Sequence, residues 1–267
     1  MKKNVVILLL ILSLLLAGCG TESTEDVKYY KTETIHTFFG AVTTREVNEY
    51  DEEWNLIHTT TYQDVAEVSQ VDYEYTETGY RMVGIQNGIE ETLEFIITKD
   101  EQGNLLRTEQ YLNGEIYNAS DCTYDENGNL LTQESSIPMA NMTVRLEMEY
   151  DEKGNHIKTV QDNGYDIGTT TYTYDADGNL LTETYHTKTG DSTSVTEYSY
   201  SDDGLIQTAL IYESDGSYSG KRITTYDKAG NMLLQEVYDA NEELMTTTAC
   251  SYVGTDGTIS SGIESEE

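Results

Sequence analysis

A tandem repeat runs through almost the whole chain and limits the folds open to it. A segment of the form Tyr-Asp-x-x-Gly-Asn-Leu-Leu returns nine times, at intervals of 24 to 26 residues, from about residue 46 to the end. Regular self-similarity of this kind is typical of tandem structural units that contact their neighbours. The nine segments begin at Tyr50, Tyr75, Lys99, Tyr124, Tyr150, Tyr174, Tyr200, Tyr226 and Tyr252.

The sequence pattern of each unit predicts two β-strands and two turns. Seven of the nine units have Gly four positions after the first residue, as at Gly128. Asp-x-x-Gly between β-rich runs fits a type I turn whose Gly takes a positive φ and forms a bulge on the returning strand. A second turn signal follows twelve to sixteen residues after the first residue, for example Asn113-Gly114 or Asn163-Gly164. Asn-Gly is a strong hairpin turn.

The composition supports the same interpretation. The chain has 22 Tyr against 3 Phe and 1 Trp, with 21 Gly and a single Pro, which is typical of half-exposed β-structure. Residues 29–50 predict a strand, a turn at Phe39-Gly40 and a second strand that starts the series. We therefore expect an all-β fold in which tandem β-hairpins of about 25 residues form a continuous antiparallel, twisted meander sheet, open or partly curled.

The two rows of turns differ. The Tyr-Asp turn keeps a constant pattern, whereas the second turn shifts in position and contains Pro138 in one unit. Because variable loops on a constant scaffold commonly carry specificity, this second row is the more favourable place for ligand discrimination. No individual ligand-binding residue is assigned from the sequence.

Tyrosines form columns across the units. Tyr172 and Tyr174 are two residues apart, as are Tyr198 and Tyr200, so each pair shares a face of its strand. The favoured interpretation is a set of cross-strand ladders that stabilise the sheet. The alternative is a platform on which sugar rings or other flat groups stack. A further column is predicted twelve positions after the unit starts, at Tyr62, Tyr111, Tyr212 and Tyr238.

Two cysteines test the topology. Cys122 and Cys250 each lie two residues before a unit's first tyrosine, in units five repeats apart. In an open meander ten strands separate them, roughly 48 Å at the usual strand spacing, which is far beyond disulfide reach. We therefore expect two free, partly buried thiols. A disulfide between them would indicate a sheet that curls back on itself.

The first residues predict export and a lipid anchor. Residues 1–18 have two lysines, a 12-residue apolar run and Leu-Ala-Gly before Cys19, the order of a secretory signal. The run is too short for a permanent transmembrane helix. Leu-Ala-Gly-Cys resembles the bacterial lipobox, which implies cleavage before Cys19 and lipidation of its thiol. The predicted parts are signal peptide 1–18, lipidated cysteine with polar tether 19–28, repeat domain 29–258 and acidic tail 259–267.

Charge and chemistry narrow the partners. Cleavage removes Lys2 and Lys3 and no acid, so the formal charge changes from −34 to −36, which disfavours nucleic acids and anionic membranes. The acids recur as turn residues, and no nucleophile elbow, phosphate loop or metal-ligand spacing is present. We expect no enzyme activity, no cofactor and no metal site, with weak calcium binding by the acidic turns as an open alternative. The four histidines are scattered, at His36, His58, His156 and His186.

The repeat resembles a known family. The recurring motif, with Tyr-x-Tyr before it in YTYDADGNLL, is similar to the YD repeat of RHS proteins, a family that includes polymorphic toxins and teneurins. It covers nearly all of residues 46–258. The resemblance implies a β-sheet that spirals into a shell or presents a surface, and an association with carbohydrate. Here the units are longer than usual, Asn replaces the frequent Arg after Gly, and nine units look too few to close a shell.

The sequence as a whole predicts a non-enzymatic module on the extracytoplasmic face of the cell membrane. It would be anchored through Cys19 and would bind a glycan, an envelope polymer or a surface protein. A hydrolase acting on envelope polysaccharide and a purely structural spacer are the alternatives.

Overall fold

The computed structural model describes residues 27–263 except for 64, 87–88 and 190–192. The predicted signal peptide and Cys19 lie outside these residues. In the described part, no helix is long and apolar enough to cross a membrane. One short 3-10 helix, η1 (Pro138–Ala140), is present there, and the rest of the regular structure consists of β-strands.

The strands follow one another along the chain as antiparallel hairpins. They are β1 (Tyr29–Phe38), β2 (Ala41–Tyr50), β3 (Leu56–Gln63), β4 (Ala66–Thr76), β5 (Gly79–Gln86), β6 (Ile89–Lys99), β7 (Leu105–Leu112), β8 (Glu115–Tyr124), β9 (Leu130–Ile137), β10 (Met142–Tyr150), β11 (His156–Asp162), β12 (Ile167–Tyr174), β13 (Leu180–Thr187), β14 (Thr193–Tyr200), β15 (Ile206–Tyr212), β16 (Tyr218–Tyr226), β17 (Met232–Asp239), β18 (Leu244–Gly254) and β19 (Ile259–Ser261).

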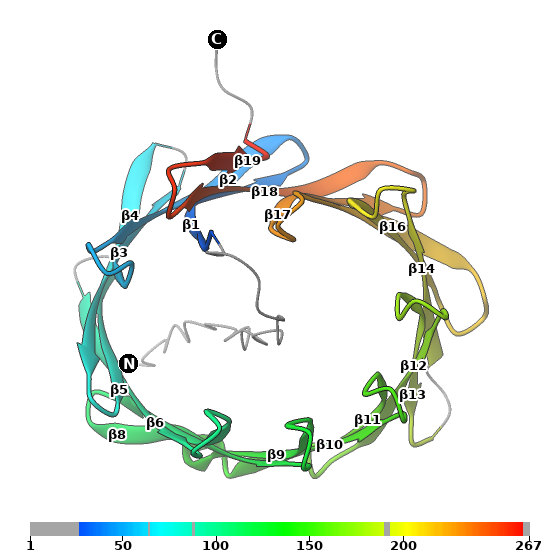
Figure 1. Ribbon diagram of the computed structural model, residues 1–267, viewed down its shortest axis with the longest axis horizontal. Helices are drawn as coiled ribbons and strands as arrows, with labels where there is room; N and C mark the ends of the chain where they lie inside the picture. Colours follow the sequence, from blue (N-terminus) through cyan, green and yellow to red (C-terminus); the bar gives the residue numbers. More distant parts are fainter. Residues whose placement is uncertain (1–26, 64, 87–88, 190–192, 264–267) are drawn as a thin grey trace, which may run out of the picture.

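The sheet is closed, so the predicted open or partly curled YD-repeat sheet is wrong. β1 pairs with β2 on one side and with β18 on the other, from Tyr29 opposite Gly254 to Phe38 opposite Thr246. Strands β1 to β18 thus form a ring (Figure 1) in which every strand has a neighbour on both sides. A ring of 18 strands has a backbone diameter of about 35 Å at the usual strand spacing and tilt.

The bulges give a physical reason for closure. Register shifts occur at six of the nine Tyr-Asp turns, for example between Thr123 and Tyr124, and also beside several of the other turns. Each bulge bends its strand and increases the local twist, so small bends of the same sense accumulate around the sheet. Closure also leaves the 18 ring strands without a free edge.

The last two strands complete the wall beside the closure. The first part of β18 pairs with β17, as in Ala249 opposite Leu234, and its last part pairs with β19, as in Val253 opposite Ile259. β19 therefore continues the line of β17 along β18. The sheet extends to Ser261, so residues 259–261 belong to it, whereas residues 264–267 lie outside the described part.

Six of the seven Tyr-Asp turns predicted from Gly have a glycine with positive φ; the exception follows β4, where Gly79 begins β5, pairs with Thr76 and has no positive φ. In the turn after β8 the amide of Gly128 donates to the carbonyl of Asp125 at 3.1 Å, and Gly128 has a φ of +84°. The Asp125 carboxylate accepts hydrogen bonds from the amides of Asn127 and Asn129 and from the Asn129 side chain, at 2.8 to 2.9 Å. The recurring Asn is thus a structural partner of the recurring Asp. The same Asp–Asn pairing recurs at Asp51, Asp100, Asp151, Asp175 and Asp227.

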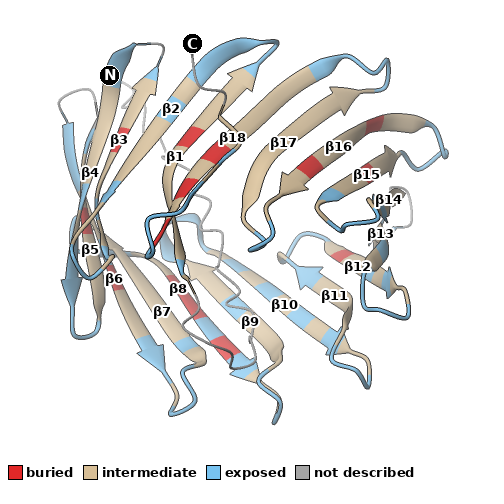
Figure 2. Cartoon of the chain, turned by 45° about the horizontal axis from the view of Figure 1, so that its top comes forward, coloured by how far each residue is buried: buried red, intermediate tan, exposed pale blue. Residues whose placement is uncertain are grey.

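The two open ends of the barrel carry the two rows of turns. We call the end formed by the turns after even-numbered strands the Tyr-Asp rim, and the end formed by the turns after odd-numbered strands the variable rim. Exposed residues concentrate at these two ends (Figure 2), whereas the middle of the wall is half-buried, with scattered buried residues.

The first tyrosine of each unit faces the lumen. In Figure 1 the Tyr-Asp rim faces the viewer, and the strands follow one another anticlockwise around the ring. To an observer outside the barrel, with the Tyr-Asp rim at the top, each strand therefore has the preceding strand on its left. The amide of Tyr226, on an ascending strand, donates back to Leu205 before β15 at 2.8 Å. When an L-residue on an ascending strand has its N–H pointing left, its side chain points away from the observer. Because the observer stands outside the barrel, the Tyr226 side chain points into the lumen.

The opposite face of the strands forms a charged outer wall. Cross-strand ion pairs lie on it, including Arg81–Glu74 at 3.1 Å and Lys158–Glu149 at 2.6 Å. Threonine pairs such as Thr173 and Thr182, whose hydroxyls are 2.6 Å apart, lie on the same face. Individual pairs of this kind contribute little to stability, but they show that this face is suited to water.

Both cysteines are free and buried on the inner face, and the predicted absence of a disulfide is confirmed. The predicted reason, a separation of ten strands in an open sheet, is wrong because the sheet is closed. Cys122 on β8 and Cys250 on β18 are ten strands apart one way around the ring and eight the other. They therefore lie on nearly opposite sides of the lumen, which keeps them apart even in a closed sheet.

Candidate functional site: the tyrosine-lined lumen

Eight tyrosines follow one end of the lumen and are called the tyrosine ring here. Each is the last lumen-facing residue before a Tyr-Asp turn, because the repeat places it at the same register in every unit. Most are half-buried, and Tyr252 is the most buried at 9% exposed. The ring consists of Tyr50, Tyr75, Tyr124, Tyr150, Tyr174, Tyr200, Tyr226 and Tyr252.

Hydroxyls of this ring are used within the wall. Tyr124 donates its hydroxyl proton to the carbonyl of Leu105, the first residue of β7, at 2.9 Å. That residue belongs to the bulge of the preceding unit, so the bond ties one unit to the next. A hydrogen bond of this kind stabilises the fold by about 1 kcal/mol. The equivalent bonds are Tyr50 to Lys31, Tyr150 to Leu130, Tyr174 to His156 and Tyr200 to Leu180, at 2.6 to 3.1 Å.

This arrangement fixes the rings before any ligand arrives. In these five tyrosines the hydroxyl is tied to a backbone carbonyl, so the aromatic face is the part of the side chain that remains for contact with a ligand. A pre-organised aromatic surface loses little conformational entropy on binding. These hydrogen bonds also stabilise the sheet, which is the role that the sequence favoured for the tyrosines. The stabilising and the ligand-binding interpretations are therefore compatible.

Further aromatic side chains line the wall deeper in the lumen. The ring of His156 lies between those of Tyr150 and Tyr172, with centroids 5.3 and 4.7 Å away. Burial lowers the pKa of His156, which favours the neutral imidazole. On the other side of the barrel Tyr80 and Phe95 stack at 4.5 Å.

Polar groups interrupt the aromatic wall. The Tyr198 hydroxyl donates to the Glu183 carboxylate at 3.1 Å, and burial followed by the Glu183 charge raises the pKa of Tyr198 to about 12. On the neighbouring strands β7 and β8, Gln110 is paired with Asn118. The buried Asn118 Oδ1 has no hydrogen-bond partner among the described residues. Aromatic faces beside a few polar groups are the usual chemistry of small-molecule sites.

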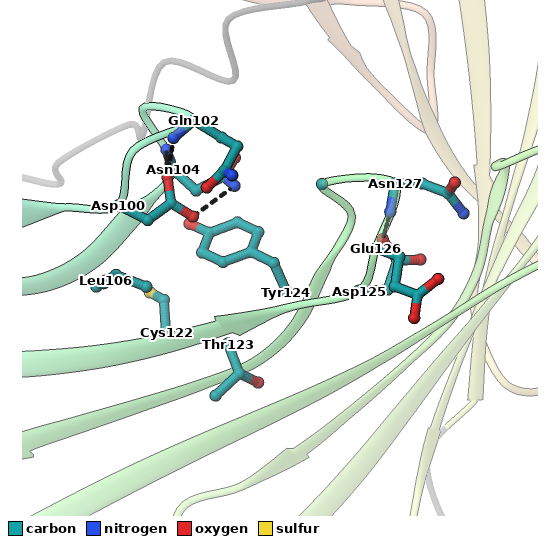
Figure 3. Close-up of a pocket in the computed structure, with 11 residues that line it drawn as sticks. Asp100, Gln102, Asn104, Leu106, Cys122, Thr123, Tyr124, Asp125, Glu126 and Asn127 are labelled. Atoms are coloured by element: carbon teal, nitrogen blue, oxygen red, sulfur yellow. Dashed lines mark hydrogen bonds between the residues drawn. The ribbon is translucent and has the colours of Figure 1, made fainter.

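A groove of about 610 Å³ lies at the Tyr-Asp rim between two successive turns. Figure 3 shows the Tyr124 ring directed toward the Asp100–Asn104 turn, while Thr123 points the other way. Cys122 lies deeper in the groove, and burial raises the pKa of its thiol, which disfavours the thiolate. The remaining lining residues are Gln102, Leu106, Asp125, Glu126, Asn127 and Gly128.

The acidic turns are occupied by their own hydrogen bonds. The side chain of Asn129 and then its amide lower the pKa of Asp125, and Asn179 acts in the same way on Asp175. These carboxylates therefore have structural partners. In the described ranges, no group of three or more His, Cys, Asp or Glu side chains is arranged to hold a metal ion.

The predicted second tyrosine column lies on the outer wall. Its members occupy equivalent rows near the variable rim. Arg45 lies over the Tyr62 ring at 5.6 Å, and Lys221 lies over the Tyr238 ring at 4.8 Å. Two of the four members thus form cation–π pairs, whereas the Tyr212 ring packs against that of Tyr218.

The histidines do not converge on one site. His36 contacts Thr248 across the β1–β18 closure, at 3.0 Å. His58 pairs with Asp72 on the outer wall at 2.6 Å, and His186 lies 3.3 Å from Thr193. His156 alone of the four lies in the aromatic part of the lumen described above.

Comparison with known proteins gives distant likenesses of structure. No protein-family profile and no curated protein matches the sequence, so the resemblance to RHS repeats stays a prediction. The barrel is similar to crystal structures of porin-like proteins from Bacteroides uniformis (8% identity, 83% of this chain and 96% of that chain, TM-score 0.43) and Bacteroides vulgatus (16%, 84% and 99%, TM-score 0.38). A structure of TcdB2-TccC3 without its hypervariable C-terminal region matches 85% of this chain and 17% of that one, at 10% identity and a TM-score of 0.30.

Proposed function

We propose that this protein is a lipid-anchored extracytoplasmic lipoprotein whose barrel binds a neutral saccharide chain in its lumen without cleaving it. The tyrosine ring carries the proposal, because five of its eight hydroxyls are engaged in the wall and its aromatic faces are left for a ligand. Sugar rings present flat apolar C–H faces beside hydroxyls, which suits stacking on tyrosines, and polar side chains such as Asn118 lie about 20 Å further along the lumen wall for later sugar units of a chain.

The dimensions of the barrel support a chain-like ligand. An 18-stranded ring is too wide for its own side chains to fill, since barrels of 16 to 18 strands leave an aqueous channel. The chain's formal charge of −34 disfavours acidic polymers, which points to a neutral glycan.

The outer wall supports a barrel that stands in water. A barrel embedded in lipid presents an apolar band outward, whereas here ion pairs such as Arg107–Asp121 at 2.6 Å and Arg145–Glu147 at 3.0 Å lie outside. The lipid on Cys19 would then hold the barrel at the membrane surface.

The proposal is tested by substituting a lumen tyrosine in two ways. Tyr172→Ala should weaken binding of a neutral oligosaccharide about two- to twelvefold, because an aromatic contact is worth about 0.5 to 1.5 kcal/mol, whereas Tyr172→Phe keeps the ring and the affinity. Tyr165→Ala, in an exposed turn, is the matched control.

The ligand would be found on a glycan array and its affinity measured by calorimetry, with reducing ends assayed in the same samples. Turnover of the bound sugar would replace the proposal with the hydrolase alternative. An absence of binding to neutral glycans would end it in favour of a structural role.

A further inference from the structure

The two rims of the barrel differ in charge. The nine inter-strand segments of the Tyr-Asp rim contain sixteen acidic and two basic residues, whereas those of the variable rim contain seven acidic and one basic. One end of the barrel is thus strongly acidic and the other is not. This difference follows from the repeat, because the Asp-x-x-Gly turn requires its acid and the variable turns do not.

The acid-poor rim exposes large apolar side chains. They lie in the turns after β1, β3, β9 and β11 or at the strand ends beside this rim, and they are 49% to 96% exposed. Near the Tyr-Asp rim most exposed apolar residues, such as Leu106 and Ile206, are 38% to 41% exposed, with Tyr75 at 52% and Ile259 on the short β19 at 76% as the exceptions. Exposed apolar side chains gathered on one surface mark an interaction site. Those of the variable rim are Phe38, Phe39, Val65, Ile89, Met139 and Tyr165.

Two turns of the variable rim combine exposed apolar side chains with a lack of charge. Phe38 ends β1 and Phe39 begins the turn that follows, and the centroids of their rings are 4.4 Å apart. The turn after β9 contains Pro138 and Met139, and neither inter-strand segment has a charged residue. The two turns are eight strands apart in a ring of 18, so they lie on nearly opposite sides of the rim.

We propose that the variable rim is a membrane-docking surface, whose apolar turn tips enter the interface of an uncharged lipid bilayer. Neighbouring turns of this rim are about 12 Å apart at the usual strand spacing and tilt, and the apolar tips stand around the end of one barrel, so they can meet a flat surface together. A bilayer offers such a surface without side-chain complementarity, and apolar groups at the end of an otherwise polar body bind at its interface.

Charge gives the docked barrel its orientation. The carboxylates of the Tyr-Asp rim lose hydration if they enter a bilayer, so this rim stays in water and faces away from the membrane, which leaves the tyrosine ring at the outer mouth. An anchor on Cys19 is compatible with this orientation. Val27 lies eight positions after Cys19, a reach of up to about 28 Å, and a tilted ten-residue strand such as β1 rises about 25 Å.

The test uses unlipidated chain 20–267, which contains every described strand, and vesicles of phosphatidylcholine. The single native tryptophan, Trp54, lies in a Tyr-Asp turn and stacks on Tyr30 at 4.7 Å, so it reports on the far rim. A Phe39→Trp, Trp54→Phe variant reports on the docking rim. Its emission should shift to the blue and be quenched by brominated lipid, while that of Trp54 in the native chain stays unchanged.

Charge substitutions supply the matched control. Phe39→Asp with Met139→Asp should weaken vesicle binding at least tenfold, whereas Ile57→Asp with Ile206→Asp, the same charge change at the Tyr-Asp rim, should change it less than twofold. Adding phosphatidylglycerol to the vesicles should weaken binding by the native chain. Circular dichroism confirms that the variants are folded.

Three results would overturn the proposal: no binding to phosphatidylcholine, a response of Trp54 to vesicles, or equal losses in the two pairs of variants. A dimer in sedimentation without lipid that the Phe39→Asp pair disrupts would instead assign the rim to contact between copies. Glycan binding is measured separately, so failure here leaves the proposed function unaffected.

Discussion

Closure of the barrel can be tested by one substitution at the β1–β18 junction. Thr34 on β1 lies directly opposite Cys250 on β18, with the Cys250 sulfur 3.9 Å from the Thr34 hydroxyl oxygen. Directly opposed residues of antiparallel strands have Cα atoms about 4.5 to 5.5 Å apart, which is within disulfide range. Thr34→Cys, in a Cys122→Ser background, should therefore form a disulfide with Cys250 on mild oxidation.

The bond should stabilise the barrel strongly because it closes a long loop. Residues 34 and 250 are 216 positions apart, and the chain-entropy relation gives about 5 kcal/mol for a loop of this length, less any strain. Urea unfolding of the oxidised and reduced forms measures the difference, and a mass decrease of about 2 Da reports the bond itself.

A neighbouring position provides the control. Thr224 on β16 is also buried on the inner face but lies two strands from Cys250, about 10 Å away at the usual spacing, so Thr224→Cys should stay reduced. If the thiol introduced by Thr34→Cys and the thiol of Cys250 both stayed free after oxidation of the folded protein, the strands would not be paired and the ring would be open.

Three further predictions concern the repeat. Tyr124→Phe, which removes the bond to Leu105, should lower the free energy of urea unfolding by about 1 kcal/mol, whereas Tyr165→Phe in an exposed turn should leave it unchanged; equal effects would contradict the proposed tie. Because hydrogen bonds lower the folded-state pKa of Asp125 and Asp175, their contribution to stability is complete above about pH 4 and is lost as the pH falls through the lowered pKa. Urea midpoints against pH should show a shallower acid limb in Asn129→Ala with Asn179→Ala, and an unchanged limb would refute the role of the amides. Tyr50 and Tyr198 have pKa values raised to about 12, so they should remain protonated at pH 11 in a phenolate absorbance titration of the folded barrel, and stability should fall as the pH rises above about 10.

The local structure of the repeat could be predicted because its causes are local. Gly128 and Asp125 determine their turn within five residues, and the alternation of side chains follows from the strand itself. The recurrence of Asn129 and its equivalents five positions after each tyrosine was visible in the sequence. It was the available signal for the Asp–Asn pair, whose role was missed.

Closure could not be predicted because its cause is distributed over the chain. Each bulge contributes a small bend, and whether the bends bring β1 to β18 depends on their sum over all the strands between. The curvature also decides which face becomes the lumen. The sequence therefore placed Tyr124 and Tyr62 in separate columns without indicating that one would face inward and the other outward.

The ring of hairpins also links the bore of the barrel to the number of repeats. Each unit adds two strands, so a gain or loss of whole units preserves the alternation of strand directions that antiparallel closure needs. Since barrel diameter grows roughly in proportion to strand number, one unit more or less would change the bore by about a ninth. Duplication or deletion of about 75 bases in the gene would thus adjust the aperture stepwise, with every turn and interlocking tyrosine retained.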